Sequence, residues 1–443
     1  MAVVGGRAPT RVAVVGAGLA GLVAARELRR HGVEVAVFEA GPRVAGLAAS
    51  HRDEDGFSYD TGAHFVTNRL AAALGVGAQC RDVHRYGESV FLDGKVLGYP
   101  FGLLRVPRFV ASAAAGRLRR RRAAPVTAAE QFAAEYGARL AEEVAGPLLE
   151  AWSGAPADRL SAAVADKLPS GLARTVALEL SPLVTRRATA VGYCRTQPER
   201  VNVWHVYPEA GVATLCQRVA DDLGDVVRLR SPVERILVEG GRVTGVRVGG
   251  EDWPADGVVS TAPVHVLPKL VEGTDRLDHL AEFRYRPMVF VNLRFEGRPL
   301  LPDVVMWVPQ REHPFFRLTE APLSMPWLAP EGKTLVTADI GAEVGDDHWT
   351  MDEDELGRLC VEHVEALVPG AASRYLGCRV VRTPLAYPVF LLDHEAERQA
   401  FERSSGVDGL LSVGRNGEFA HILMEDVYWR TRRRIAAWVE GGA

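Results

Sequence analysis

The sequence predicts an α/β protein in which a discontinuous, Rossmann-type nucleotide-binding domain carries an inserted mixed α+β domain. Three observations lead to this fold class. A short apolar run leads directly into glycines with G-x-G-x-x-G spacing, and a helical pattern follows them. A second apolar run then ends in an acidic residue. Strand-rich sequence of the same kind returns only after residue 205, which indicates that the domain is interrupted.

The first unit begins at residue 11 and reads RVAVVGAGLAGLVAARELRRHGVEVAVFEAG. Gly16 permits a tight turn, Gly18 lets the backbone approach a pyrophosphate, and Gly21 lets the helix pack closely on the strand. Leu19 and Ala20 open the helix, whose first N–H groups and partial positive charge face the phosphates. This order of strand, turn and helix predicts a dinucleotide site.

Glu39 ends the second apolar run, 18 residues after Gly21. An acid at this position accepts hydrogen bonds from the hydroxyls of a ribose. It suits a ribose without a 2′-phosphate, which argues against NADP and leaves NAD or FAD.

Composition excludes several classes of protein. The chain has 443 residues, 47% of them hydrophobic and 24% charged, with a formal net charge of −4, so nothing points to a nucleic acid partner. The five cysteines are scattered without a C-x-x-C spacing, which disfavours a disulfide framework and a zinc site, and no metal is expected. Without a signal-peptide pattern or a long apolar run, a cytoplasmic protein with no stable membrane insertion is expected.

One local stretch is strongly basic. Residues 117–125 read RLRRRRAAP. Arg119–Arg122 could make a weak surface contact with an anionic lipid or a phosphorylated partner, and a solvated arginine-rich loop is the alternative. The sequence does not predict an oligomeric state.

The interrupting sequence is rich in helices first and in strands later. Thr127 and Glu130 form a T-x-x-E capping box, which predicts a helix over residues 128–152. Further on, PMVFVNLRF and KTLVTADIG predict strands, and EDELGRLCVEHVEALV predicts a helix. The predicted nucleotide-binding domain comprises residues 9–85, 205–265 and 385–443, and the predicted substrate domain comprises residues 86–204 and 266–384.

Further motifs extend this pattern over most of the chain. The first unit continues as EAGPRVAGLAASH, YDTGAHFVTN begins at residue 59, and FLDGKVLGYPFGLL and LLEAWSGAPADRLS lie in the insert. Then come VYPEAGVATLCQRVADDL with RSPVERILVEGGRVTGVRV and, near the C-terminus, SVGRNGEFAHILMEDVYWRTRRRIAAW. In this order the chain resembles the flavin amine oxidase clan, which includes protoporphyrinogen oxidase, phytoene desaturase and UDP-galactopyranose mutase.

The resemblance implies FAD as the cofactor and His64 and Arg415 as catalytic residues. A structural histidine and a surface salt bridge are the respective alternatives. A helix that begins near Met424 would point its first amides at the flavin N1 and O2 edge, where negative charge builds on reduction. The cofactor-binding residues that the resemblance implies are Gly16, Gly18, Leu19, Ala20, Gly21, Glu39, Ala40, Arg43, Gly46, Leu47, Gly62, Ala63, His64, Val233, Gly414, Arg415, Met424 and Glu425.

Two departures from the clan's motifs matter. Ala45 stands where the first glycine of a Gly-Gly doublet usually lies, and GVAT at residues 211–214 replaces a glycine, tyrosine, threonine segment of the mutase. Trp152 either lines a substrate cavity or packs in the core. Four arginines, Arg195, Arg200, Arg284 and Arg286, are candidates for binding a substrate diphosphate.

The resemblance implies an FAD-dependent oxidoreductase that oxidises or desaturates a biosynthetic small molecule, with sugar-containing molecules included. Such enzymes pass a hydride to the flavin N5 atom. A UDP-galactopyranose mutase-like isomerase is the first alternative, because both ends of the chain resemble that family. A non-catalytic FAD-binding protein is the second. No lysine can be placed at the flavin-facing position of true amine oxidases, which disfavours a simple monoamine oxidase.

Overall fold

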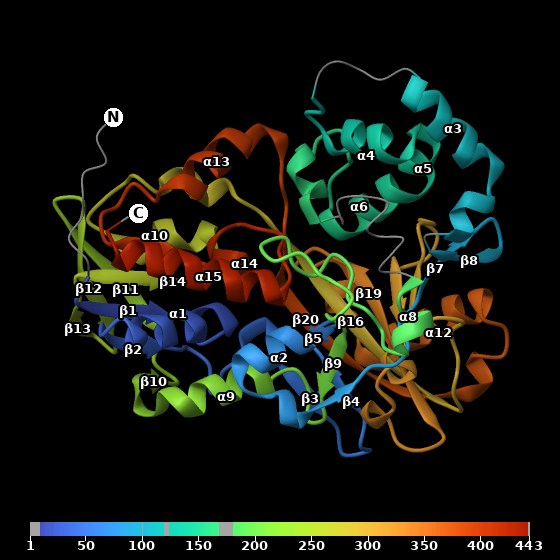
Figure 1. Ribbon diagram of the computed structural model, residues 1–443, viewed down its shortest axis with the longest axis horizontal. Coiled ribbons are helices and arrows are strands. Elements are labelled where there is room, and N and C mark those ends of the chain that lie inside the picture. Colours follow the sequence, from blue (N-terminus) through green and yellow to red (C-terminus); the bar gives the residue numbers. More distant parts are fainter. Residues whose placement is uncertain (1–8, 100, 119–123, 168–179, 442–443) are drawn as a thin grey trace.

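A computed structural model describes residues 9–99, 101–118, 124–167 and 180–441. Arg119–Arg122 therefore lie outside the described residues. Figure 1 shows a part built on β1, β2 and β14 at one end, and a second part at the other end in which α3 to α6 lie beside a larger sheet. The predicted α/β fold class, with one nucleotide-binding part and one mixed part, is confirmed.

The nucleotide-binding part is built on a five-stranded parallel sheet with the order β10-β2-β1-β14-β21. Val12, Ala13 and Val14 in its central strand have no exposed surface, because the strand is covered on both faces. Three helices, α1, α9 and α15, pack together beside the sheet. The elements are β1 (Arg11–Val15), α1 (Leu19–Arg30), β2 (Glu34–Phe38), α9 (Thr214–Leu223), β10 (Val227–Arg228), β14 (Gly257–Ser260), β21 (Leu410–Ser412), α14 (Gly414–Gly417) and α15 (Met424–Val439).

Smaller elements join this part to the rest of the chain. A four-stranded sheet has the order β13-β12-β11-β15, and two small sheets have the orders β3-β4 and β5-β9-β6. The elements are β3 (Ser50–Arg52), β4 (Ser58–Asp60), β5 (Val66–Thr67), α2 (Asn68–Leu74), β6 (Cys80–Asp82), α8 (Pro182–Thr185), β9 (His205–Pro208), β11 (Val233–Glu239), β12 (Arg242–Val248), β13 (Glu251–Pro254), α10 (Leu267–Leu270), β15 (Val271–Glu272) and α13 (Glu395–Arg403).

The second part is built on a seven-stranded sheet with the order β20-β16-β19-β18-β17-β7-β8. Its strands and helices include the predicted strands over PMVFVNLRF and KTLVTADIG and the predicted helix α12, all three of which are confirmed. β20 continues beyond residue 384, so the sheet crosses that predicted domain boundary. The elements are β7 (Glu88–Leu92), β8 (Lys95–Tyr99), β16 (Tyr285–Glu296), β17 (Val305–Trp307), β18 (Arg317–Thr319), β19 (Lys333–Gly341), α11 (Asp347–Thr350), α12 (Glu353–Leu367) and β20 (Tyr375–Pro388).

Short helices cover one end of this sheet. The predicted cap is present, since the Thr127 hydroxyl accepts a hydrogen bond of 3.2 Å from the Glu130 N–H. The prediction of one helix over residues 128–152 is wrong. Gly137 adopts a φ of +90°, and a Cβ there would lie 2.7 Å from the Ala113 nitrogen, so the chain turns where it crosses α3. The elements are α3 (Pro107–Leu118), α4 (Ala128–Tyr136), α5 (Ala138–Leu140) and α6 (Gly146–Ser153).

Three further properties concern the described residues only. None of their helices is both long and apolar enough to cross a membrane. All five cysteines are free thiols, and no group of three or more acidic, histidine or cysteine side chains within the described ranges could hold a metal ion. The cytoplasmic location stays a prediction.

Candidate active site

The glycine turn after β1 has the geometry that close approach requires. Gly16 adopts a φ of +97°, and a Cβ there would lie 2.3 Å from the Thr261 Oγ1 atom. A Cβ on Gly21 would lie 1.9 Å from the Gly16 carbonyl oxygen, so α1 packs directly against the turn. Gly18 differs, because the nearest atom to a Cβ there is 3.9 Å away. Open space at Gly18, before an α1 N-terminus without a side-chain cap, suits a pyrophosphate.

The segment after Glu39 folds back onto this turn. The Ala45 N–H donates a 3.0 Å hydrogen bond to the Ala17 carbonyl, and Ala45 forms an isolated bridge with Gly18. Ala45 adopts a φ of +93°, a left-handed conformation that favours glycine, so the alanine is accommodated with strain. Gly46 and Arg43 are exposed, and Leu47 is half-buried. The two backbone segments thus line the same end of the sheet.

Glu39 lies at the carboxyl end of β2, beside the glycine turn. Its carboxylate accepts hydrogen bonds of 2.8 Å from the Ala17 N–H and of 2.8 Å from the Gly41 N–H. The Ser231 N–H donates to the Glu39 carbonyl at 2.8 Å, which places the start of β11 next to this acid. Val233 is half-buried two residues further on, and Ala40 is exposed. These contacts bring the glycine turn, Glu39 and the start of β11 to one edge of the sheet.

Gly414 joins the C-terminal segment to the same place. It adopts a φ of +85°, and a Cβ there would lie 2.5 Å from the Ala20 Cβ atom at the start of α1. The Gly414 N–H donates a 3.0 Å hydrogen bond to the buried Glu418 carboxylate. The guanidinium nitrogens of Arg430 and Arg434 lie 2.6 and 3.1 Å from a carboxylate oxygen of Glu418 and compensate its charge. Glu418 therefore fixes the backbone at Gly414 rather than facing the site with a free charge.

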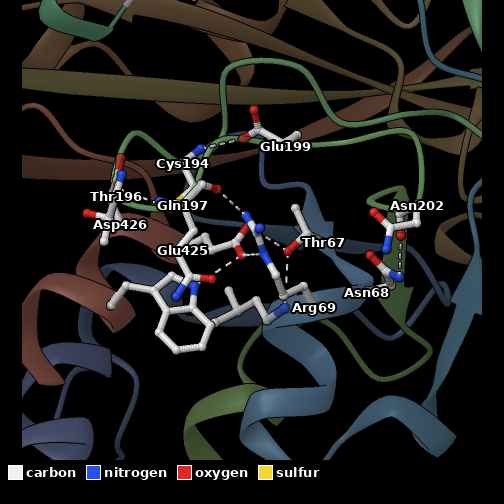
Figure 2. Close-up of polar contacts among 12 residues, drawn as sticks. Thr67, Asn68, Arg69, Cys194, Thr196, Gln197, Glu199, Asn202, Glu425 and Asp426 are labelled. Carbon is white, nitrogen blue, oxygen red and sulfur yellow. Dashed lines mark hydrogen bonds and ion pairs between the residues drawn. The ribbon is translucent and has the colours of Figure 1, made fainter. Parts of the chain in front are cut away.

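The first turn of α15, which begins at Met424 as predicted, is held by its own acidic side chains (Figure 2). The buried Glu425 carboxylate accepts a 2.8 Å hydrogen bond from the Thr67 hydroxyl and also pairs with Arg69. Arg69 in turn donates to the Gln197 carbonyl at 2.6 Å. The Glu425 side chain is thus engaged by α2 and the segment near residue 197. Any contact of Glu425 with a cofactor must come through its backbone.

The Asp426 side chain binds backbone N–H groups of the same segment. Its carboxylate accepts hydrogen bonds of 3.0 Å from the N–H groups of both Arg195 and Thr196 (Figure 2). Glu199 closes this loop by accepting a 2.5 Å hydrogen bond from the Cys194 N–H. The two acids of α15 and Glu199 together fix the loop against the helix N-terminus.

His64 lies beside a cavity between the β4–β5 connection and the seven-stranded sheet. The cavity is lined on one side by Asp60, Gly62, Ala63 and His64, and on the other by residues that include Thr319 and Thr337. The His64 Nδ1 atom lies 3.6 Å from the Asp60 carboxylate. Asp60 also accepts a 2.6 Å hydrogen bond from Ser50 and one from the Tyr207 hydroxyl. Gly62, with a φ of +91°, packs against the Phe290 ring.

A buried ion pair lies near His64. Arg317 pairs with Asp339, which has no exposed surface. Burial acts to lower the pKa of Arg317, yet Asp339 raises it above its ordinary value. Burial raises the pKa of Asp339 against the opposing positive charge of Arg317. The sequence contained no motif around either residue, so their pairing could not be predicted.

Arg415 lies in an aromatic environment. Its guanidinium carbon lies 4.8 Å from the centroid of the Tyr387 ring. Burial lowers the pKa of Arg415, and the positive charge of Arg317 lowers it further. Trp152 and His421 complete the cluster, with ring centroids 4.4 Å apart, and Trp152 meets Tyr387 edge-on at 5.1 Å. Trp152 thus packs within this cluster, in agreement with the core-packing interpretation.

The four arginines proposed as diphosphate ligands fall into two groups, and Arg286 is paired in register with Tyr387. Arg284 and Arg286 both pair with Glu343. The side chains of Arg195 and Arg200 are exposed on the loop that Asp426 holds. Arg317 lies close enough to Arg415 to lower its pKa.

A family model described as flavin-containing amine oxidoreductase matches residues 19–416. The chain belongs to this family. Its sequence is 47% identical to mitochondrial protoporphyrinogen oxidase of Nicotiana tabacum over 57 residues, 13% of this chain and 11% of that protein. It is 47% identical to all-trans-zeta-carotene desaturase of Myxococcus xanthus over 64 residues, 14% and 12% of the two chains. The chain spans at most 18% of the length of the first curated relatives that it matches.

A solved structure of reduced UDP-galactopyranose mutase shares the fold over nearly the whole chain. Its TM-score is 0.79 at 17% sequence identity, over 98% of this chain and 96% of that one. At this identity the likeness establishes the fold alone.

Family membership identifies FAD as the cofactor of this flavin-dependent enzyme. The site fits that dinucleotide, because a glycine turn with room for a pyrophosphate, an acid for the ribose and the backbone at Gly414 meet at one edge of the sheet. The prediction of FAD is confirmed.

Glu39→Ala is expected to give a folded protein that retains FAD poorly. The substitution removes the acceptor for a ribose hydroxyl and two backbone hydrogen bonds, and a hydrogen bond to a charged group contributes about 1.5–3 kcal/mol. The measurement is flavin absorbance per protein after gel filtration, with circular dichroism to check folding. Glu39→Gln, which keeps one acceptor oxygen, should retain more FAD. Full flavin occupancy in Glu39→Ala would contradict the assignment.

Proposed function

We propose that this protein is an FAD-dependent oxidoreductase that oxidises or desaturates a biosynthetic small molecule, with sugar-containing molecules among the candidate substrates. When bound, FAD supplies a hydride acceptor at its N5 atom. In this proposal residues 9–85, 205–265 and 385–443 hold the cofactor, and residues 86–204 and 266–384 supply most of the substrate-facing side chains. The proposed cofactor contacts are those of the glycine turn, Glu39, the segment through Leu47, Val233, and the backbone from Gly414 to Glu425.

The observation that carries the proposal is the placement of Arg415 beside an aromatic cluster and next to Gly414. An aromatic wall and a guanidinium can hold a flat or ring-shaped substrate and orient its polar groups. Arg317 is compensated by Asp339, whereas Arg415 faces the Tyr387 ring. We assign Arg415 the binding of an electron-rich substrate group.

His64 is the second residue to which we assign a role in the reaction. Asp60, near its Nδ1 atom, can orient the imidazole and favour a proton on Nδ1. The other ring nitrogen is then an acceptor that can hold a proton released by the substrate. Apolar side chains, among them Phe65 and Leu335, line part of the neighbouring cavity.

A mutase-like isomerase is the second candidate, favoured by the similarity of fold to UDP-galactopyranose mutase. The oxidoreductase is preferred because GVAT at residues 211–214 departs from the mutase motif, and because Glu343 already pairs with Arg284 and Arg286, two of the diphosphate arginines proposed from the sequence. A non-catalytic FAD-binding protein is the third candidate, and turnover of any substrate would exclude it.

The redox state of the flavin distinguishes the candidates. An oxidoreductase moves two electrons from substrate to flavin, so a substrate found by screening amines, alcohols and sugar nucleotides should bleach the oxidised flavin band without oxygen. A mutase consumes no electrons. If dithionite-reduced protein interconverts the pyranose and furanose forms of UDP-galactose at enzymatic rates, the oxidoreductase proposal is wrong.

Arg415→Ala is expected to lower turnover by roughly tenfold or more while FAD stays bound, because a charge-assisted hydrogen bond to the substrate is lost. The measurement is kcat/KM together with flavin content. Arg415→Lys keeps the charge without the planar fork and should recover part of the activity. Arg403→Ala, on the surface helix α13, is the control. Turnover unchanged from the wild type in Arg415→Ala would assign Arg415 a purely structural role.

A further inference from the structure

Exposed apolar side chains gather on one corner of the molecule. Among the described residues, eleven large hydrophobic side chains are exposed, and five of these fall within fifteen residues of the chain. They are Val96, Tyr99, Phe101, Leu104 and Val110. Val96 and Tyr99 lie on opposite faces of β8, because side chains alternate along a strand, and we call the last four residues the β8–α3 surface. Leu104 is 68% exposed, the highest value in this set. Single exposed hydrophobic residues are ordinary, whereas several within one short segment indicate an interaction site.

The helix α3 extends this surface. Val110, Ala111, Ala114 and Ala115 are exposed and share one face at helical spacing, with Arg108 one turn before Ala111. In Figure 1, α3 and β8 lie at the outer edge of the second part, far from β1, β2 and β14. The surface is therefore remote from the proposed cofactor site and does not rest on the proposed function.

Positive charge accompanies the apolar side chains. Within residues 95–116 the charged residues are Lys95, Arg105 and Arg108, and none is acidic, in a chain whose formal net charge is −4. Lys95 and Arg105 are exposed within the β8–α3 surface. Arg108 is exposed as well, and its charge is compensated by Asp93 at 2.6 Å and Glu143 at 2.8 Å. Because apolar and basic side chains occur together, the partner should offer both apolar and anionic groups.

We propose that the β8–α3 surface docks the protein peripherally on an anionic lipid bilayer. A bilayer interface takes aliphatic side chains such as Leu104 into the acyl boundary, aromatic side chains such as Tyr99 at the headgroup level, and cations against anionic headgroups. A nucleic acid would satisfy the cations but gains little from exposed aliphatic side chains.

A second copy of the chain is the competing occupant, because β8 is an edge strand of its sheet. A two-fold contact at this edge would bring the same basic stretch of both copies together. The resulting repulsion between like charges disfavours that arrangement.

Vesicle flotation of the FAD-loaded protein tests the proposal. The wild type should float with vesicles of phosphatidylcholine plus phosphatidylglycerol, and weakly or not at all with phosphatidylcholine alone. Leu104→Asp should lower partitioning roughly tenfold or more, because it removes apolar burial and adds a repelled charge. The matched control is Val344→Asp, since Val344 is 62% exposed but lies after β19, outside this surface. High salt should weaken binding by screening the cations.

A second variant measures whether residue 104 enters the bilayer, and this measurement does not depend on loss of binding. Leu104→Trp should show a blue shift of fluorescence on adding anionic vesicles, beyond any shift of the wild type. Three results would overturn the proposal: no flotation of the wild type, equal flotation of Leu104→Asp and Val344→Asp, or a lipid-free dimer that only Leu104→Asp dissociates. The last result would assign the surface to self-association.

Discussion

Gly21→Ala is expected to destabilise the nucleotide-binding part severely and to yield protein without flavin. An added Cβ would lie 1.9 Å from the Gly16 carbonyl oxygen, and that oxygen belongs to backbone that cannot rotate away. The helix α1 would have to move off β1, and overpacking of this kind costs about 1–3 kcal/mol or more. Thermal unfolding and the ratio of flavin to protein after purification measure the two effects.

Gly18→Ala is the matched control, because it adds the same methyl group three residues earlier. The nearest atom to that Cβ is 3.9 Å away, and Gly18 has an ordinary φ of −73°, so the fold should tolerate the change. FAD retention should still fall, since the methyl group occupies space that a pyrophosphate needs. If the Gly21→Ala protein is as stable as the Gly18→Ala protein, α1 does not pack against the Gly16 turn as closely as the structure shows.

Arg317→Met is expected to lower the free energy of unfolding by about 3–5 kcal/mol, because it leaves the fully buried Asp339 carboxylate without its cation. Burial already raises the pKa of Asp339, and removing Arg317 raises it further above the unfolded value. A carboxyl group with a raised pKa is most favourable when protonated. The deficit against the wild type should therefore shrink as the pH falls and grow as the pH rises.

Two controls accompany this measurement in urea unfolding. Arg247→Met removes a cation from an exposed pair with Asp252 and should change stability by less than about 1 kcal/mol. The double variant Arg317→Met with Asp339→Leu should recover much of the loss, because no charge is then left unpaired. If Arg317→Met costs no more than Arg247→Met, the buried pair does not stabilise the fold.

Local sequence patterns were enough to predict the nucleotide-binding part. The apolar run before Gly16 and the glycine spacing reflect constraints that act within a few residues, such as turn conformation and helix packing. The same reasoning located Glu39 and the capping residue Thr127, and the family resemblance located the start of α15 at Met424. It failed where a glycine looked compatible with a continuous helix, because the close approach of α3 that requires Gly137 comes from another segment.

The sequence by itself therefore determined the fold class, the family resemblance and the dinucleotide edge. Only the tertiary structure showed which side chains lie near His64 and Arg415. Arg317 and Asp339 lie on neighbouring strands, Tyr387 and Arg415 are 28 residues apart, and the Glu425 carboxylate accepts a hydrogen bond from Thr67. Burial and charge pairing between distant segments fix these contacts, and such energies depend on the three-dimensional surroundings of each group rather than on its neighbours in sequence.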